Sequence, residues 1–322
     1  MNKFKVVICD YYYESLQQEK QVFSQMDIDL KDYHCKTEDE VIQVASECDA
    51  LICQFAPITR RVIENLKNCR VIVRYAIGVD NIDLKAAEEH GIYVCNVPDY
   101  GVDEVSNHAI ALLLDCAKKL SFLADQVKKG NNSYTVVKPL YRISGKTLGL
   151  VGFGRIPQLV ARKMASFGVN IIAYDPMINE AAARELNVTS VSLEELLECS
   201  DYISVHCPLM ASTHHMFNKE TFQKMKPTAI FINTARGGVV KEEDLVWALE
   251  NGVISMAGLD VTEVAPVAVD NPLLKLPNAI VTPHAAWYSV EAVETLQRMA
   301  AEEVVRALKG EPLRSPVNHP KK

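Results

Sequence analysis

Two side chains in the second half of the chain have the chemistry to bind a carboxylate and to exchange a proton. Arg236 lies in Asn233-Thr-Ala-Arg-Gly-Gly238, directly after the apolar run Ala229–Ile232. Its guanidinium suits a carboxylate and can also polarise a carbonyl. His284 follows another apolar run, in Val281-Thr-Pro-His-Ala-Ala-Trp-Tyr288, and histidine is the usual acid or base near neutral pH. Taken alone, such residues are more often a surface arginine and a structural histidine, so the assignment stays open at this point.

A glycine loop gives a stronger signal. The apolar run Leu148–Val151 leads into Gly152-Phe-Gly-Arg-Ile-Pro157, a helical pattern follows over 158–167, and the next strand pattern ends at Asp175. In the dinucleotide-binding arrangement the first glycine makes the turn, the second lets the pyrophosphate approach, and the later acid bonds the ribose hydroxyls. The predicted cofactor contacts here are Gly152, Phe153, Gly154, Arg155, Ile156 and Asp175.

Asp175 also indicates which dinucleotide is bound. Its carboxylate would repel a 2′-phosphate, which favours NAD over NADP. The third glycine position of the motif holds Pro157, which falls in the first helical turn, where proline is tolerated. We expect altered helix packing there and an intact site.

The elements that must position these residues alternate between β-branched runs and amphipathic stretches. This alternation predicts an α/β fold of βαβ units, with two doubly wound parallel sheets in one chain. The expected strands are Lys5–Cys9, Ala50–Cys53, Val71–Val73, Thr147–Val151, Asn170–Tyr174, Tyr202–Val205, Ala229–Ile232 and Ile254–Leu259. The expected helices include Thr37–Ser46 and Thr59–Leu66, each with its threonine as N-cap, and the longer Val102–Lys119 and Val290–Lys309. The two long helices flank a middle block, which predicts an inserted domain, and the tail 316–322 is expected to be loosely held.

Composition excludes several classes of protein. The 322 residues are enough for two domains, and the net charge of −7 without a basic stripe argues against nucleic acid as a partner. No apolar run is long enough to span a membrane, and the N-terminus does not resemble a signal peptide. The nine cysteines form no CxxC pair, so we expect no metal site and a reducing, cytoplasmic location.

Several long segments together resemble the D-isomer-specific 2-hydroxyacid dehydrogenase family over nearly the whole chain. They are Arg74–Asp83, His90–Pro98, the glycine loop, Asn233–Gly238, Ala257–Val261 and the His284 segment. Within the family, 282–289 and 74–83 look closest to the C-terminal-binding-protein branch. The resemblance implies a Rossmann NAD domain at 101–289, inserted in a flavodoxin-like substrate domain made of 1–100 and 290–322. It also implies a homodimer built largely through the NAD domain.

The resemblance implies a role for each matching residue. Arg236 would hold the substrate carboxylate and carbonyl, His284 would deliver a proton as the nicotinamide delivers hydride, and Asp260 would bond the nicotinamide carboxamide. Further cofactor contacts would be His206, Cys207, Pro208, Thr213, Thr234, Ala235 and His284. The substrate contacts would be the backbone of Tyr75, Ala76, Ile77 and Gly78, with Phe55 and Trp287 at the pocket wall.

One departure from the family pattern concerns the chemistry itself. The family has a catalytic glutamate five positions after the aspartate of its Leu-Asp-Val motif, and here that position holds Ala265. The missing carboxylate would orient the imidazole and favour its charged form, and losing such a group typically costs orders of magnitude in rate. Three alternatives follow. Glu263 substitutes; His284 acts alone or with a substrate-borne acid; or the chain is an NAD(H)-binding sensor or scaffold with little turnover. The presence of both Arg236 and His284 favours an enzyme.

The substrate class is marked only weakly. The stretch Cys53–Ala56 is neutral, and Arg60 and Arg61 fall in the following helix. A phosphorylated substrate would need a cation at the pocket wall, so we expect a small or apolar 2-oxoacid. Phe55 and Trp287 suit an apolar side chain, although both are equally well ordinary core aromatics.

Overall fold

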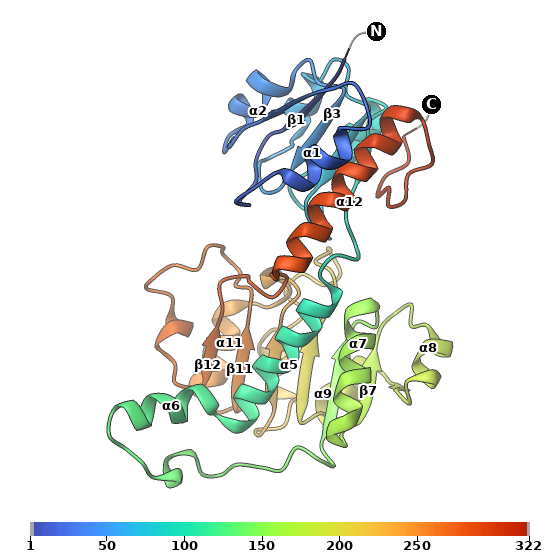
Figure 1. The fold of residues 1–322 in the computed structure, drawn as a ribbon. Helices are drawn as coiled ribbons and strands as arrows, with labels where there is room; N and C mark the ends of the chain where they lie inside the picture. The colour runs from blue at the N-terminus through green and yellow to red at the C-terminus, as the bar shows by residue number, and fades with distance from the viewer. Residues whose placement is uncertain (1–2, 321–322) are drawn as a thin grey trace. The chain divides into compact units, whose positions relative to one another are not determined.

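The computed structural model describes residues 3–320. They form two compact units: the residues up to Gly101 together with those from Tyr288 onward make the first, and Val102–Trp287 makes the second. Each unit is built on a sheet whose strands are all parallel (Figure 1). The predicted α/β fold with two doubly wound sheets is confirmed.

The first unit has five strands in the order β2-β1-β3-β4-β5, which is the flavodoxin-like order. They are β1 (Phe4–Ile8), β2 (Ile28–Asp32), β3 (Ala50–Cys53), β4 (Val71–Arg74) and β5 (Tyr93–Cys95). Its helices are α1 (Gln17–Phe23), α2 (Glu38–Ala45), α3 (Arg60–Glu64), α4 (Leu84–Glu89) and α12 (Val290–Lys309). Alternate strand residues pack against α2, α3 and α4 on one face and against α1 and α12 on the other.

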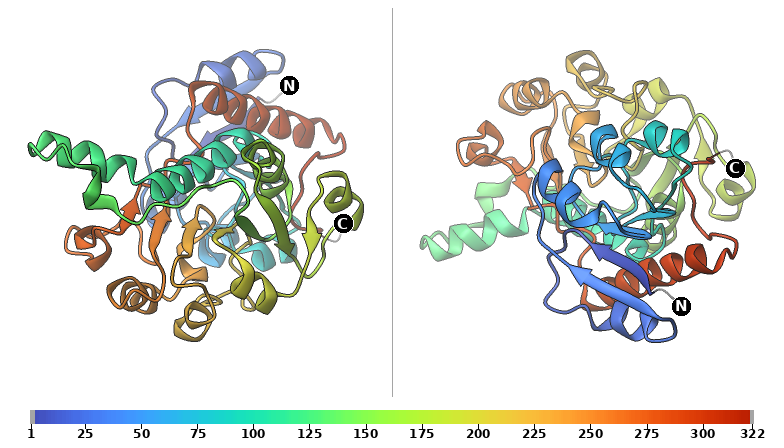
Figure 2. Two further views of the ribbon diagram at one scale, coloured as in Figure 1. Left: turned by 90° about the horizontal axis from the view of Figure 1, so that it is seen from below. Right: turned by 90° about the horizontal axis from the view of Figure 1, so that it is seen from above.

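The second unit has seven strands in the order β12-β11-β10-β9-β6-β7-β8. They are β6 (Thr147–Val151), β7 (Asn170–Tyr174), β8 (Thr189–Ser190), β9 (Tyr202–Val205), β10 (Ile230–Asn233), β11 (Met256–Leu259) and β12 (Ala279–Val281). Its helices are α5 (Val102–Lys118), α6 (Leu120–Lys128), α7 (Arg155–Met164), α8 (Glu180–Glu185), α9 (Leu193–Cys199), α10 (Lys219–Gln223) and α11 (Glu242–Glu250). Helices α5 and α7 cover one face of the sheet, and α9, α10 and α11 cover the other (Figure 2).

The predicted ends of the elements are close to the observed ones, with two corrections. Thr37 caps α2 through a capping box, but the side chain of Thr59 makes no cap hydrogen bond to α3. The start of the C-terminal tail is well held: Pro316 bridges Cys95 at the sheet edge, and the buried Asn318 side chain bonds the backbone of Ile92 and Val94. The prediction of a loose tail is therefore wrong up to residue 320. No helix among residues 3–320 is long and apolar enough to cross a membrane.

Candidate active site

The glycine loop joins β6 to α7 where the strand order reverses. β6 has β7 on one side and β9 on the other, and open parallel sheets bind ligands at the carboxyl ends of the strands at such a point. Gly152 has φ of +91°, and a Cβ there would lie 3.0 Å from backbone atoms of His206 and Cys207. A side chain at Gly152 would therefore be both strained and crowded.

Gly154, the second glycine, borders open space. A Cβ added there would meet no described atom within 4 Å. Gly154 is the N-cap of α7, and no side chain in residues 3–320 caps that helix. The first turn of the helix contains Arg155, Ile156 and the buried Pro157, so the proline lies in the first turn, as predicted. The N–H groups of a helix start favour an anion, so this space suits a pyrophosphate.

We expect Gly154→Ala to weaken NADH binding while leaving the thermal stability of the protein unchanged. The added methyl group would occupy the space beside the helix start, which costs about 1–3 kcal/mol in the complex, or roughly a ten- to hundredfold loss of NADH affinity. The melting temperature should stay near that of the wild type, because the methyl group contacts no described atom. Calorimetric titration with NADH and thermal unfolding measure the two effects. The control is Gly152→Ala, which should lower the melting temperature.

Asp175 follows β7 and fixes the glycine loop. Its carboxylate accepts the N–H of Phe153 at 2.8 Å and the N–H of Met177 at 2.8 Å. Carboxylate oxygens have further lone pairs, which leaves acceptors for ribose hydroxyls. Phe153 itself is buried.

The loop after β9 contains the predicted cofactor contacts His206, Cys207, Pro208 and Thr213. Burial lowers the pKa of His206 to about 3, so its ring is neutral at physiological pH and cannot supply the proton. Burial also raises the pKa of the Cys207 thiol, to about 11. The Thr213 hydroxyl donates to the carbonyl of Pro208 at 2.6 Å and accepts the N–H of Met210 at 2.8 Å. The Thr213 side chain therefore stabilises this loop through hydrogen bonds to the loop's own backbone.

Arg236 lies in a tight loop at the end of β10. The side chain of Asn233 closes the loop by donating to the carbonyl of Arg236 at 3.0 Å and accepting the N–H of Ala235 at 2.9 Å. A Cβ at Gly237 would lie 1.8 Å from the carbonyl oxygen of Thr262, so the loop presses against the backbone that follows β11. The guanidinium of Arg236 is half-buried and donates to the carbonyl of Ala235 at 2.8 Å.

Thr234 lies two residues before Arg236 in the same loop. Its hydroxyl oxygen is buried and has no hydrogen-bond partner in residues 3–320. Buried polar atoms are normally satisfied, so an unsatisfied hydroxyl beside a candidate site indicates a missing ligand.

His284 lies in a turn that Asp260 holds from both its backbone and its side chain. The carbonyl of Asp260 accepts the N–H of His284 at 3.0 Å. The buried carboxylate of Asp260 accepts the N–H groups of Ala285 at 3.0 Å and Ala286 at 2.8 Å. His284 itself is exposed and has φ of +55°, a conformation that costs a non-glycine residue about 1–2 kcal/mol. The indole N–H of Trp287 donates to the carbonyl of His284 at 3.0 Å.

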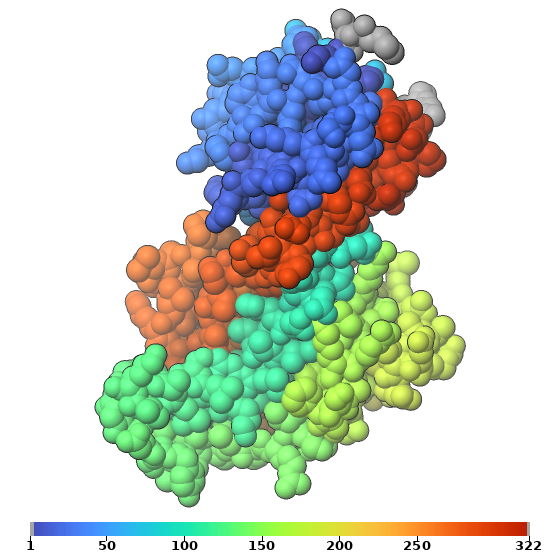
Figure 3. Space-filling model, viewed as in Figure 1, coloured from blue at the N-terminus to red at the C-terminus, as the bar shows by residue number. Residues whose placement is uncertain are grey.

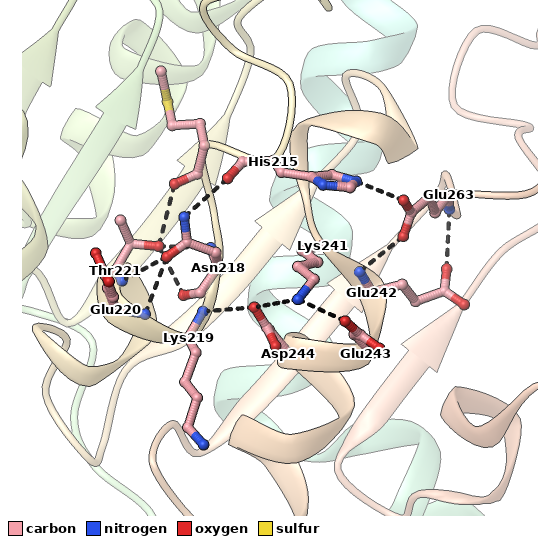
Figure 4. A network of polar contacts seen from close by, with 11 residues as sticks. His215, Asn218, Lys219, Glu220, Thr221, Lys241, Glu242, Glu243, Asp244 and Glu263 are labelled. Carbon is pink, nitrogen blue, oxygen red and sulfur yellow. Dashed lines mark hydrogen bonds and ion pairs between the residues drawn. The ribbon is translucent and has the colours of Figure 1, made fainter.

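Glu263 contacts a different histidine from the one that a catalytic substitute would need. Its carboxylate accepts from the ring of His215 at 2.6 Å and from the N–H of Glu242 at 3.0 Å (Figure 4). Partial burial raises the pKa of Glu263, but the Glu242 N–H and His215 outweigh this and hold it below its usual value. Glu263 therefore joins His215 to the start of α11, and its role as a substitute for the family glutamate stays a prediction. Ala265 lies in the same segment and is exposed.

The candidate substrate residues of the first unit lie in two loops after β3 and β4. Asp10 accepts the N–H groups of Gln54, Phe55 and Ala56 at 2.6–3.0 Å, which fixes the loop that exposes Phe55. The second loop is Tyr75–Gly78. The phenol of Tyr75 is buried and donates to Glu19, and the Ala76 N–H bonds the carbonyl of Arg74. The N–H groups of Ile77 and Gly78 have no partner within the described part of the chain.

Three residues of the site were missed by sequence reasoning. They are Asn233, which closes the Arg236 loop, and Thr282 and His108, which contact Asp260. Asn233 and Thr282 lie inside quoted motifs, so their position was a usable signal. His108 is 174 residues from Thr282 and lies in an ordinary amphipathic helix, so the sequence offers no signal for it.

The second unit fits NAD on several independent observations. Gly154 borders open space, the Thr234 hydroxyl lacks a partner in residues 3–320, and Asp175 stands at the end of β7. Large apolar side chains are exposed next to these loops: Met177 follows Asp175 closely, and Leu209 and Met210 follow Pro208. A flat aromatic base would cover such side chains.

Comparison with known proteins agrees with this site. Residues 110–286 match the family model described as D-isomer specific 2-hydroxyacid dehydrogenase, NAD binding domain. A glyoxylate reductase of Korarchaeum cryptofilum is 40% identical over 275 residues, which are 84% of this chain and 83% of that one. A D-3-phosphoglycerate dehydrogenase of Archaeoglobus fulgidus is 37% identical over 88% of this chain, which spans only about half (54%) of that relative. The D-lactate dehydrogenase of Aquifex aeolicus, solved with NAD and lactic acid, aligns with a TM-score of 0.86 at 29% identity, covering 98% of this chain and 100% of that one.

Proposed function

Because the chain belongs to the D-isomer specific 2-hydroxyacid dehydrogenase family and binds NAD, we propose that it reduces a small 2-oxoacid, with Arg236 and His284 as its catalytic residues. One observation carries this proposal. Asp260, at the end of β11, donates its N–H to the carbonyl of Asn233 in the Arg236 segment and accepts the N–H of His284 on its own carbonyl. The loops after β10 and β12, the two strands that flank β11, are thus joined through Asp260.

The mechanism follows from the charge and proton capacity of the two side chains. When bound, NADH supplies a hydride to the carbonyl carbon of the oxoacid. Arg236 binds the carboxylate with a bidentate pair and draws electron density from the carbonyl oxygen. Protonated His284 donates its proton to that oxygen as negative charge develops there, which leaves a neutral imidazole and a hydroxyacid. In the oxidative direction, neutral His284 takes the hydroxyl proton.

The remaining substrate contacts in this proposal are two backbone N–H groups and two aromatic side chains. Two neighbouring N–H groups without partners in residues 3–320, those of Ile77 and Gly78, suit a carboxylate oxygen. We also propose that Phe55 and Trp287 contact an apolar substituent of the oxoacid.

An unphosphorylated oxoacid fits the charge around this unit. Arg60 has a partner in Glu89 at 2.6 Å, and Arg61 pairs with Asp39. The loop Cys53–Ala56 has no cation of its own. The glyoxylate reductase relative, matched over 83% of its length, supports the same substrate class.

The exposed Ala265 favours a second candidate: an NAD(H)-dependent sensor or scaffold with little turnover, in keeping with the resemblance of 282–289 to the C-terminal-binding-protein branch. The test is NADH oxidation by the purified protein with glyoxylate, pyruvate, hydroxypyruvate, phenylpyruvate, 2-oxo-4-methylthiobutyrate and phosphohydroxypyruvate. Saturable turnover with an unphosphorylated member supports the enzyme. If no member is reduced while NADH binds tightly, the sensor is supported, and turnover of phosphohydroxypyruvate alone contradicts the substrate class.

We propose a homodimer that forms through α6 and the segment after it. Helix α6 buries none of its residues and stands out from the body of the second unit in green (Figures 1 and 3). Four large apolar or aromatic side chains of α6 and the segment after it are about half exposed or more: Leu120, Val127, Tyr134 and Tyr141. Exposed apolar surface of this kind is typical of an interface.

Light scattering should give twice the chain mass, and Leu120→Asp combined with Tyr134→Asp should give a monomer. A wild-type monomer at micromolar concentration would contradict the proposal.

A cytoplasmic location is part of the same proposal. All nine cysteines are free thiols, and eight of them are buried. Free buried thiols in this number are typical of a reducing compartment.

A further inference from the structure

His108 lies beside the turn that carries His284. It is on α5, its side chain is 25% exposed, and its Nε2 atom lies 3.0 Å from the hydroxyl oxygen of Thr282 and 3.4 Å from Oδ1 of Asp260. We infer that His108 is a positioning residue, which fixes the turn of His284 through Thr282 and Asp260. This inference rests on the proposed role of His284.

The direction of the hydrogen bonds identifies His108 as a donor. The Asp260 carboxylate accepts from two backbone N–H groups, and its Oδ1 lies 2.6 Å from the hydroxyl oxygen of Thr282. A carboxylate has no proton to give, so the single proton of the Thr282 hydroxyl points to Asp260. The hydroxyl oxygen of Thr282 then accepts from Nε2–H of His108. Both the Nε2–H tautomer and the charged imidazolium of His108 have this N–H group.

The hydrogen bonds among His108, Thr282 and Asp260 stabilise a turn whose backbone conformation is unfavourable by itself. His284 has a left-handed backbone at φ of +55°, and such a conformation persists only where the surroundings fix it. Asp260 accepts three of the hydrogen bonds that fix this turn, those from the N–H groups of His284, Ala285 and Ala286. His108 fixes the Thr282 hydroxyl against one oxygen of the Asp260 carboxylate. In this chain Ala265 replaces the residue that would orient the imidazole directly, so the backbone of the turn determines more of its orientation.

Trp287 reports on the turn without any need for turnover. Its indole N–H donates to the carbonyl of His284 at 3.0 Å, and the chain's one other tryptophan is Trp247 on α11. In a Trp247→Phe background, the emission of Trp287 measures the environment of the turn.

Four variants in this background test the inference. His108→Leu and Thr282→Val remove the donor and the acceptor, while His108→Gln keeps an N–H donor and Thr282→Ser keeps the hydroxyl. We expect His108→Leu and Thr282→Val each to shift the Trp287 emission and to lower kcat about tenfold, as a slight displacement of a proton donor does. The KM for the oxoacid should stay unchanged, because Arg236 binds the carboxylate. His108→Gln and Thr282→Ser should restore emission and most of kcat, and the double variant His108→Leu with Thr282→Val should be no worse than either single one.

Three results would overturn the inference: unchanged Trp287 emission in both His108→Leu and Thr282→Val, a His108→Gln variant as impaired as His108→Leu, or fully additive effects in the double variant. If His108→Leu does not fold, the comparison of Thr282→Val with Thr282→Ser and the behaviour of His108→Gln decide the question. A protein that reduces none of the oxoacids contradicts the proposed function alone, and the emission comparison then still tests the hold of His108 on the turn.

Discussion

Replacing His284 with asparagine should lower kcat for oxoacid reduction by a factor of about a hundred to ten thousand, the usual contribution of a positioned acid. Asparagine is the suitable replacement, because it tolerates the left-handed backbone that His284 adopts at φ of +55°. The loss is then due to the imidazole and not to a rearranged turn. Single-turnover measurements of NADH oxidation give the chemical step, and titration with NADH shows that the cofactor still binds.

Arg236→Gln is the matched comparison for this variant. Its main effect should be a higher KM for the oxoacid, because the substrate carboxylate loses its bidentate partner.

The pH dependence of the reaction is a further check on the role of His284. In the proposed mechanism reduction needs protonated His284, so kcat/KM for the oxoacid should fall as rising pH deprotonates the imidazole, and the oxidative direction should show the opposite trend. His206 does not contribute to this profile, since burial lowers its pKa to about 3. Near-normal kcat in His284→Asn would exclude His284 as the acid.

Introducing the missing carboxylate by Ala265→Glu should raise kcat by about ten- to a hundredfold, a conservative share of what an orienting carboxylate contributes in other enzymes. Ala265 is exposed, so the longer side chain has room. A carboxylate beside the imidazole favours its charged form and raises its pKa. The pH at which kcat/KM for reduction begins to fall should therefore be higher in Ala265→Glu than in the wild type. Steady-state kinetics over a pH series measure both changes in one experiment.

The control is Val264→Glu, which places the same charge one residue earlier on a side chain that is 70% exposed. If Val264→Glu has the same effect as Ala265→Glu, the gain comes from the general electrostatic field and not from a carboxylate positioned at the imidazole. No gain from Ala265→Glu would mean that this chain orients His284 by other means, and the turn held by Asp260 is the structural candidate.

The prediction of the fold depended on local signals, which is why it agrees with the structure. Buried parallel strands are short β-branched runs, and such runs coincide with β3, β6, β7 and β9. The end of the long helix at Lys309 was equally readable, because Gly310 has φ of +70° and closes the helix. Thr59 shows the limit of this kind of reasoning: the residue type suits a cap, but its hydroxyl makes no such bond.

Local sequence patterns are enough to predict the fold class, the glycine loop and the order of the motifs, because each depends on neighbours a few residues away. The same patterns predict that Arg236 and His284 follow strands, and parallel topology brings the ends of those strands to one edge of the sheet. The partners of the charged and polar groups, in contrast, are known only from the three-dimensional structure. Glu263 binds His215 across 48 residues, His108 reaches Thr282 across 174, and Asn318 bonds the β5 edge across more than 200. Such contacts are fixed by packing between distant segments, and no local pattern of residue types encodes which of several chemically equivalent partners a side chain will meet.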